Sequence, residues 1–191
     1  MGQAEKIYIT EQEYIESERL SDVKHEYFQG EIFAMSGASI PHIEISMNIS
    51  VDLATKLKGK KCRPYGSDMR MNIPENTLYT YPDLSVYCDE VETLDDNKDT
   101  AKKPTVIFEI LSKSTRNYDQ GEKFALYRQI PTLKEYILID SEQIKVILNS
   151  KNENSSWNLT EFTSINDIFE IKSLAVEMRL VDIYEDVIFV K

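Results

Sequence analysis

The sequence predicts a mixed α/β fold in which a central mixed β-sheet is flanked by helices. Three observations lead to it: helix-type apolar spacing after Pro41, an almost unbroken apolar stretch around Phe108, and three strand-like segments after Pro131. Apolar residues recur every three to four positions in helices and every two in strands. The chain has 191 residues and is expected to form a single domain, residues 1–191, because about 150 residues is typical of one domain.

The N-terminal part predicts a short helix followed by a hairpin. Thr10 and Glu13 have the spacing of a capping box, in which each side chain accepts a hydrogen bond from the other residue's backbone N–H. Strand-like triplets at 26–28 and 31–33 flank Gln29-Gly30. Glycine accepts the positive φ that a tight hairpin turn requires, so a hairpin is expected there.

A second helix is expected from about Pro41 to about Gly59. Proline is favoured at the first helical position, where its missing N–H would have no partner within the helix. The apolar residues that follow recur at helical intervals and form one stripe: Ile43, Met47, Val51, Ala54 and Leu57.

The remaining chain predicts strands around one further helix. Strands are expected at 62–73, 78–88 and 105–111. Asp119 is expected to cap a helix that runs to about Gln129, before Pro131 stops it. An antiparallel meander is then expected, with strands at 136–139, 144–148 and 157–162.

The chain is acidic, with 33 Asp and Glu against 22 Lys and Arg and a formal charge of −11. This charge repels nucleic acids and anionic membranes at long range, so it opposes non-specific binding to either. A local basic track at the end of the second helix is the exception: Lys56, Lys58, Lys60, Lys61 and Arg63. These cations could contact a phosphate backbone, or they could complement the helix dipole in solvent.

Neither a membrane segment nor a metal-type cysteine motif is evident. No apolar run approaches the ~18 residues of a membrane span, and the start of the chain lacks the apolar part of a secretion signal. A cytoplasmic protein with no membrane partner is therefore expected. Cys62 and Cys88 are far apart and lack His or Cys neighbours at ligand spacing, so two buried thiols are expected rather than a disulfide or a zinc site.

Glu109 interrupts the apolar stretch from Val106 to Leu111. A strand that is apolar on both faces is usually buried on both. A lone ionised carboxylate in such a strand costs several kcal/mol unless it is paired, hydrogen-bonded or bound to a metal. Glu109 therefore needs a partner, either a core cation in a structural ion pair or a metal ion.

Asp83, like Glu109, is an acidic residue inside an expected strand, here the strand that precedes 105–111. Aspartate is disfavoured inside strands, and the adjacent Pro82 marks a strand start, an edge or a bulge. The connection to the Glu109 strand is short, so the two strands are expected to be neighbours and the two acids to converge. Two hard carboxylates completed by water suit Mg²⁺ or Mn²⁺. The alternative is that Asp83 is a turn residue beside proline.

Lys123 lies near the start of the helix that follows the Glu109 strand, with Tyr127 one turn further on the same face. From there the lysine can reach back to the carboxylates. It could orient the attacking water, help to lower the pKa of that water, or neutralise charge on a phosphorane-like transition state. The alternative is a surface pair between Asp119 and Lys123.

Three segments together resemble a known family. They are 81–83 (YPD), 108–115 (FEILSKST) and 119–127 (DQGEKFALY). They are similar to the "putative restriction endonuclease" family, a former domain of unknown function abundant in cyanobacteria, which belongs to the PD-(D/E)XK nuclease superfamily. The similarity extends from about residue 8 to about residue 185, including the segment 25–31 and His42. It implies a restriction-endonuclease-like core and a metal-dependent phosphodiesterase.

The resemblance also implies residue roles. Asp83 and Glu109 would be the metal ligands, Glu26 the N-terminal acid of the site, and Lys123 the catalytic lysine. The superfamily's lysine stands two residues after the glutamate, where this chain has Leu111. This chain is similar to the family in having the lysine displaced onto the following helix, where it would be Lys123. Three points stay open: Lys113 as a second candidate lysine, Glu31 in place of Glu26, and His42 as a phosphate or metal contact or as a structural hydrogen-bond partner.

The sequence thus favours a Mg²⁺- or Mn²⁺-dependent endonuclease acting on DNA, with Asp83, Glu109, Lys123 and Glu26 in its site. Two alternatives stay open: an inactive nuclease-like module used for binding or assembly, and a metal-dependent hydrolase of small phosphate esters. A homodimer is a further hypothesis, because cutting both strands needs two sites and twofold dimers are the commonest oligomers.

Overall fold

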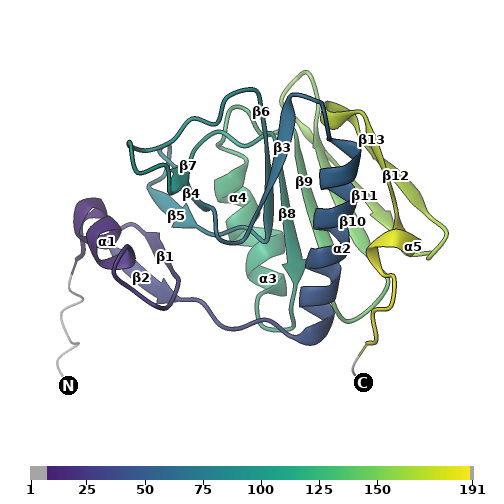
Figure 1. Ribbon diagram of the computed structural model, residues 1–191, viewed down its shortest axis with the longest axis horizontal. Coiled ribbons are helices and arrows are strands. Elements are labelled where there is room, and N and C mark those ends of the chain that lie inside the picture. Colours follow the sequence, from purple (N-terminus) through teal and green to yellow (C-terminus); the bar gives the residue numbers. More distant parts are fainter. Residues whose placement is uncertain (1–7, 190–191) are drawn as a thin grey trace.

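The computed structural model, which describes residues 8–189, has the expected α/β architecture with mixed sheets flanked by helices (Figure 1). These residues form two larger sheets and a separate hairpin. The sheet here called the central sheet has the order β11 (Trp157–Phe162), β10 (Val146–Lys151), β9 (Glu135–Asp140), β8 (Val106–Leu111), β6 (Leu84–Cys88) and β3 (Cys62–Gly66). The N-terminal sheet has the order β2 (Glu31–Ala34), β1 (His25–Phe28), β5 (Leu78–Thr80), β4 (Arg70–Ile73) and β7 (Thr100–Ala101).

The helices and the hairpin lie around these sheets. The hairpin consists of β12 (Ile168–Ile171) and β13 (Val176–Arg179), joined by the 3₁₀ turn η2 (Lys172–Leu174). The longer helices are α1 (Glu11–Glu18) and α2 (Ile40–Lys56). A continuous helical stretch contains α3 (Arg116–Tyr118), the π-helical turn η1 (Asp119–Lys123) and α4 (Phe124–Tyr127), and α5 (Leu180–Ile183) follows β13. Figure 1 shows α1 and β1–β2 at one end of the molecule and β12, β13 and α5 at the other.

The central sheet is buried on both faces at β8. This strand runs parallel to β9 and antiparallel to β6, and all its residues are buried. Val106, Phe108 and Ile110 pack with α2, whereas Ile107 and Leu111 pack with Tyr127 and the N-terminal sheet. Strand alternation therefore assigns Glu109 to the second face, which α4 covers.

In helix α2 the predicted apolar stripe faces away from the core. The exception is Leu57, the C-cap residue, which is buried. The buried residues of the helix are a different set: Pro41, Ile45, Ile49, Leu53 and Leu57, of which the last four pack in the core on the central sheet. Ile43, Met47 and Val51 are exposed on the opposite side of the helix. Both sets have helical spacing, so periodicity could not tell which of them the sheet would cover.

Two of the expected strands are in fact pairs of strands in different sheets. The segment 62–73 divides into β3 and β4, and the segment 78–88 divides into β5 and β6. The second break falls at residues 81–83, where Pro82 provides no N–H for a ladder. The chain crosses there from the N-terminal sheet to the central sheet, and Asp83 lies at the crossing.

The helix after β8 begins earlier than expected. It starts at Arg116, so Asp119 is inside the helical stretch and does not cap it. The π-helical turn from Asp119 to Lys123 buries both of these side chains. Such turns are rare and often occur at functional sites.

Several local predictions are confirmed. The Thr10–Glu13 capping box is formed in full. The β1–β2 hairpin turns at Gln29 and Gly30, which have φ of 48° and 90°. The meander β9–β10–β11 is antiparallel as expected, whereas the β12–β13 hairpin was not anticipated.

The prediction of two unpaired thiols is wrong. Cys62 and Cys88 form a disulfide, and both are half-buried. The two residues face each other directly in the β3–β6 ladder, although 26 positions separate them in the sequence. That pairing depends on strand register, which the cysteine spacing alone does not reveal.

Candidate active site

The structure brings Asp83 and Glu109 together at the junction of the two sheets. Leu84 pairs with Phe108 in the antiparallel β6–β8 ladder, so Asp83 lies opposite Glu109 at the end of that ladder. The Asp83 backbone N lies 3.4 Å from Glu109 Oε2. The Ile110 N–H donates to Asp83 Oδ2 over 2.7 Å. Backbone groups of rigid strands thus hold both carboxylates at one point.

Lys123 reaches this point from η1. Its Nζ lies 2.9 Å from Glu109 Oε1, 3.1 Å from Glu26 Oε1 and 3.8 Å from Asp119 Oδ1. Lys123 is 5% exposed and Glu109 is 4% exposed. The ammonium group is therefore a buried cation surrounded by carboxylates from β1, β8 and η1.

Two hydroxyl groups complete the cluster. Tyr127 Oη donates to Glu109 Oε1 over 2.7 Å, and the Thr80 hydroxyl donates to Glu26 Oε1. Both Tyr127 and Thr80 are fully buried. Together with Lys123, they give Glu26 and Glu109 the hydrogen bonds that buried carboxylates need.

The cluster carries an excess of negative charge, with the carboxylates of Glu26, Asp83, Glu109 and Asp119 around the Lys123 ammonium. Burial raises the pKa of Glu109 to about 8, although Lys123 opposes this shift, and burial also raises the pKa of Asp119. Burial would lower the pKa of Lys123, but the surrounding carboxylates outweigh it, and that pKa is well above its ordinary value. A further positive charge would relieve this imbalance.

His42 also belongs to this region. It lies in the first turn of α2, whose N-cap Ser39 accepts from the His42 N–H. His42 Nε2 and Asp83 Oδ1 are 2.8 Å apart, a hydrogen-bond distance. The histidine and the Ile110 N–H therefore hold different oxygens of the Asp83 carboxylate.

The donor set fits a hard divalent cation held by few protein ligands. No group of three or more His, Cys, Asp or Glu side chains among residues 8–189 is arranged to hold a metal ion. Mg²⁺ commonly uses only one or two carboxylates and keeps several waters. Asp83 and Glu109 could provide those carboxylates, and the excess negative charge suits a cation there.

Other residues named from the sequence lie elsewhere. Lys113 is exposed in the turn between β8 and α3, so Lys123 is the lysine that reaches the carboxylates. Glu31 begins β2 and pairs with Phe28, whereas Glu26 contacts Lys123. Thr80 was not expected in this cluster, and Asp119 was expected at the start of a helix rather than inside it. The spacing of Asp119, Lys123 and Tyr127, four residues apart along one helix face, was the available signal for Asp119.

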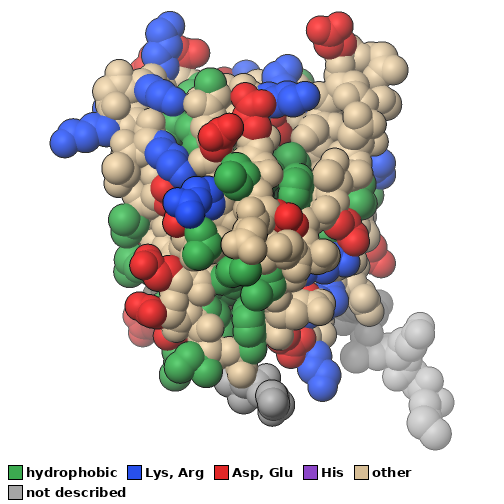
Figure 2. Space-filling model, turned by 90° about the vertical axis from the view of Figure 1, so that its right-hand side faces the viewer, with side chains coloured by type: hydrophobic (Ala, Val, Ile, Leu, Met, Phe, Trp, Pro, Cys, Tyr) green, Lys and Arg blue, Asp and Glu red, His purple; other side chains and the backbone are tan. Residues whose placement is uncertain are grey.

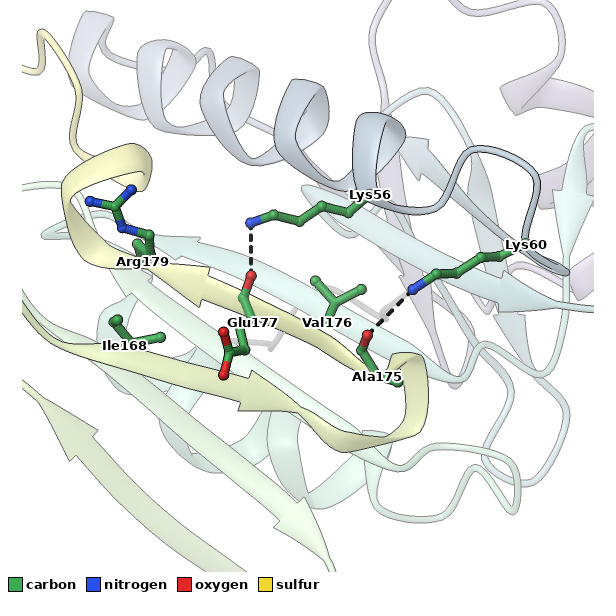
Figure 3. A pocket seen from close by; sticks show the side chains of 7 residues that line it. All are labelled: Lys56, Lys60, Ile168, Ala175, Val176, Glu177 and Arg179. Carbon is green, nitrogen blue, oxygen red and sulfur yellow. Dashed lines mark hydrogen bonds between the residues drawn. The ribbon is translucent and has the colours of Figure 1, made fainter.

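The predicted basic track is not part of this cluster. It lies at the C-terminal end of α2, and 17 helical residues, ~25 Å, separate that end from the end that carries His42. Lys56 Nζ donates to the Glu177 carbonyl, and Lys60 Nζ approaches the Ala175 carbonyl (Figure 3). Lys56 Nζ also donates to Asp52. A cavity of about 520 Å³ lies there, lined by Lys56, Lys60, Ile168, Ala175, Val176, Glu177 and Arg179. The structure therefore favours a structural role for these two lysines.

Comparison with known proteins identifies the family. The model of the Uma2 family, described as "putative restriction endonuclease", matches residues 11–181. This chain belongs to the Uma2 family. Uma2 membership confirms the resemblance seen in the sequence and supports a nuclease-like role.

Relatives and a solved structure agree with the Uma2 assignment. The chain is 35% identical over 183 residues to the uncharacterized protein slr1290 of Synechocystis sp., covering 95% of this chain and 94% of that protein. It is 34% identical to the uncharacterized protein sll1609 of the same organism, covering 88% and 95%. A crystal structure described as a putative nuclease belonging to DUF820, from Anabaena variabilis, superimposes with a TM-score of 0.73 at 16% identity, covering 88% of this chain and 93% of that one. At that identity the match establishes the fold.

Between residues 8 and 189, no helix is long and apolar enough to cross a membrane.

Proposed function

We propose that this Uma2 protein is a metal-dependent endonuclease that hydrolyses phosphodiester bonds in DNA. The observation that carries the proposal is the meeting of Asp83 and Glu109 beside the buried ammonium group of Lys123. Membership in the Uma2 family and the nuclease-like fold support it.

Asp83 and Glu109 would hold the divalent cation. When bound, such an ion lowers the pKa of a water ligand and offsets negative charge on the phosphate oxygens. His42 and the Ile110 N–H hold Asp83, and Tyr127 holds Glu109, so both carboxylates would be oriented before the ion arrives.

Lys123 would act as a cation and hydrogen-bond donor. Its pKa is well above the ordinary lysine value because Glu109, Glu26 and Asp119 outweigh the effect of burial. It is therefore protonated at neutral pH and cannot serve as a general base. Its role would be to orient the attacking water and to stabilise charge that develops on the phosphate. Glu26 would hold the amine in place.

The inactive module and the small-ester hydrolase, the two alternatives from the sequence, assign different roles to these residues. An inactive module would use Lys123 as a permanent replacement for a metal ion, and its position among three carboxylates is the observation that favours this alternative. A small-ester hydrolase would use the same residues without requiring DNA.

Nicking of supercoiled plasmid DNA tests the proposal. We expect nicking with Mg²⁺ or Mn²⁺, none with EDTA, and a loss of at least about 100-fold in Asp83→Asn and Lys123→Met. The first variant removes a ligand of the cation, and the second removes a positive charge that would stabilise the transition state. Lys113→Met is the matched control and should retain activity, since Lys113 is exposed away from the cluster. Circular dichroism would show that each variant is folded.

The same experiment separates the alternatives. Absence of nicking under all metal conditions, in folded protein, would reject the nuclease. Cleavage of bis-p-nitrophenyl phosphate without cleavage of DNA would indicate a small-ester hydrolase. Equal nicking by the wild type and Asp83→Asn would indicate a contaminating nuclease.

A further inference from the structure

The outward side of α2 is apolar, although α2 already packs on the central sheet through its inner side. Its exposed apolar residues, here called the outer face of α2, are Ile40, Ile43, Met47, Val51 and Ala54. Ile40 is 72% exposed and Met47 is 61% exposed. At 100° per residue, the outer face lies roughly opposite the buried residues Ile45, Ile49 and Leu53. A helix with two apolar sides has more apolar surface than residues 8–189, the described part of the chain, cover.

The spacing of the outer face is symmetric about Met47. The intervals from Ile40 to Ala54 are three, four, four and three residues. If two such helices cross antiparallel with Met47 on a twofold axis, Ile43 lies opposite Val51 of the other copy. Ile40 then lies opposite Ala54. The surface is therefore complementary to itself, as a twofold interface requires.

Charge also favours a second copy at this face. The chain carries a formal charge of −11, so two copies repel each other at most surfaces. The five side chains of the outer face carry no charge, and the acidic residue of α2 nearest to them, Glu44, lies at the edge of the face beside Val51. A residue on the axis meets its own copy, and Met47 is uncharged and has a flexible side chain that can adapt to the contact. Antiparallel helices also place their dipoles in opposite directions.

Neighbouring residues extend the apolar surface. A standard interface buries ~800 Å² on each partner, which is more than one helix face provides. Asn48 of α2 donates to the carbonyls of Ile183 and Glu185, so the C-terminal segment lies beside α2. This segment adds the exposed side chains of Val181 and Ile188. Figure 2, which looks onto the side with α5 and the β12–β13 hairpin, shows hydrophobic side chains gathered down the middle of the surface.

We propose that the outer face of α2 binds the same face of a second copy of this chain, antiparallel and with Met47 on the twofold axis. The contact rests mainly on one helix, with Val181 and Ile188 beside it, so we expect a weak, reversible dimer. The proposal does not depend on nuclease activity, and its tests measure association alone.

Sedimentation velocity over a range of protein concentrations tests the surface. We expect a reversible dimer in the wild type, and a dissociation constant at least about tenfold higher in Met47→Glu, which places two like charges together on the axis. Leu159→Glu on β11 is the matched control, because Leu159 is 62% exposed but lies far along the central sheet. It should dimerise as the wild type does. A wild type that is monomeric at several hundred micromolar, or a dimer unaffected by Met47→Glu, would overturn the proposal.

A charge exchange tests the antiparallel register. Ile43→Glu and Val51→Lys should each weaken the dimer, because each places a charge opposite an apolar side chain. The double variant should restore it, because each new glutamate then lies opposite the new lysine of the other copy. Both positions are exposed, so thermal denaturation should show all variants folded. A double variant as weak as the single variants would contradict this register.

Discussion

At the scale of single residues, the main question is how a carboxylate is tolerated inside the central sheet. Glu109 is 4% exposed, and an unpaired charge there would cost several kcal/mol. Lys123 and Tyr127 both bind its Oε1, while Oε2 faces the Asp83 backbone. One oxygen is thus fully satisfied and the other is oriented toward Asp83, where the proposed cation would bind.

Tyr127→Phe tests how much this environment stabilises the fold. The substitution removes the hydroxyl that donates to Glu109 and keeps the ring in the core. Hydrogen bonds to charged groups contribute about 1.5–3 kcal/mol, so above the Glu109 pKa of about 8, where this carboxylate is ionised, we expect the free energy of unfolding to fall by that amount. Urea denaturation in metal-free buffer measures it. A loss below about 0.5 kcal/mol would show that the hydroxyl is not needed to accommodate Glu109.

The site was only partly predictable from the sequence. Asp83 and Glu109 were found because each violates the pattern of its strand. Thr80 was not found, because a threonine in a strand violates no rule. The partner of Glu26 depends on which sheet receives β1, and local sequence does not determine that.

At the scale of elements, the crossing at residues 81–83 positions the site. Pro82 indicated a strand start, an edge or a bulge, yet the sequence did not show that β5 and β6 belong to different sheets. The meander and the hairpin were predictable because turn residues lie directly between strands. Which side of α2 packs on the sheet was not predictable, because both sides of this helix have helical apolar spacing.

Gly30→Ala tests the hairpin that carries Glu26. Gly30 has φ of 90°, and an added Cβ would lie 2.2 Å from the Tyr8 ring. Alanine at a positive φ costs more than about 1 kcal/mol, so we expect at least that loss in the free energy of unfolding. Gly37→Ala is the matched control, because a Cβ there meets no atom within 4 Å. Equal losses in the two variants would contradict the turn geometry described here.

The ion pair between Arg19, at the end of α1, and Asp99, directly before β7, should make the free energy of unfolding depend on pH. Arg19 holds the pKa of Asp99 at about 2, below the ordinary value of 3.8. A carboxyl with a lowered pKa in the folded state stabilises the fold above its unfolded pKa. That contribution is lost as the pH falls through about 2.

Asp99→Asn should therefore flatten the dependence of stability on pH between about 4 and 2. Chemical denaturation of the wild type and the variant across this range measures the effect. Parallel stability curves would show that the Arg19–Asp99 pair does not contribute.

At the scale of the whole molecule, charge is distributed unevenly. The chain carries a formal charge of −11, and four of its carboxylates converge where the two sheets meet. Lys56 and Lys60 lie at the other end of α2 and bind this chain's own carbonyl groups. A polyanionic substrate would therefore meet an acidic protein, and a divalent cation at Asp83 and Glu109 would have to favour its approach.

Calorimetric titration with Mn²⁺ tests the central claim most directly. We expect one binding site per chain in the wild type and no measurable binding in Asp83→Asn or Glu109→Gln. Lys113→Met should bind as the wild type does. A folded wild type that binds no Mn²⁺, or that binds it equally after Asp83→Asn, would contradict the assignment of these two carboxylates to a metal site.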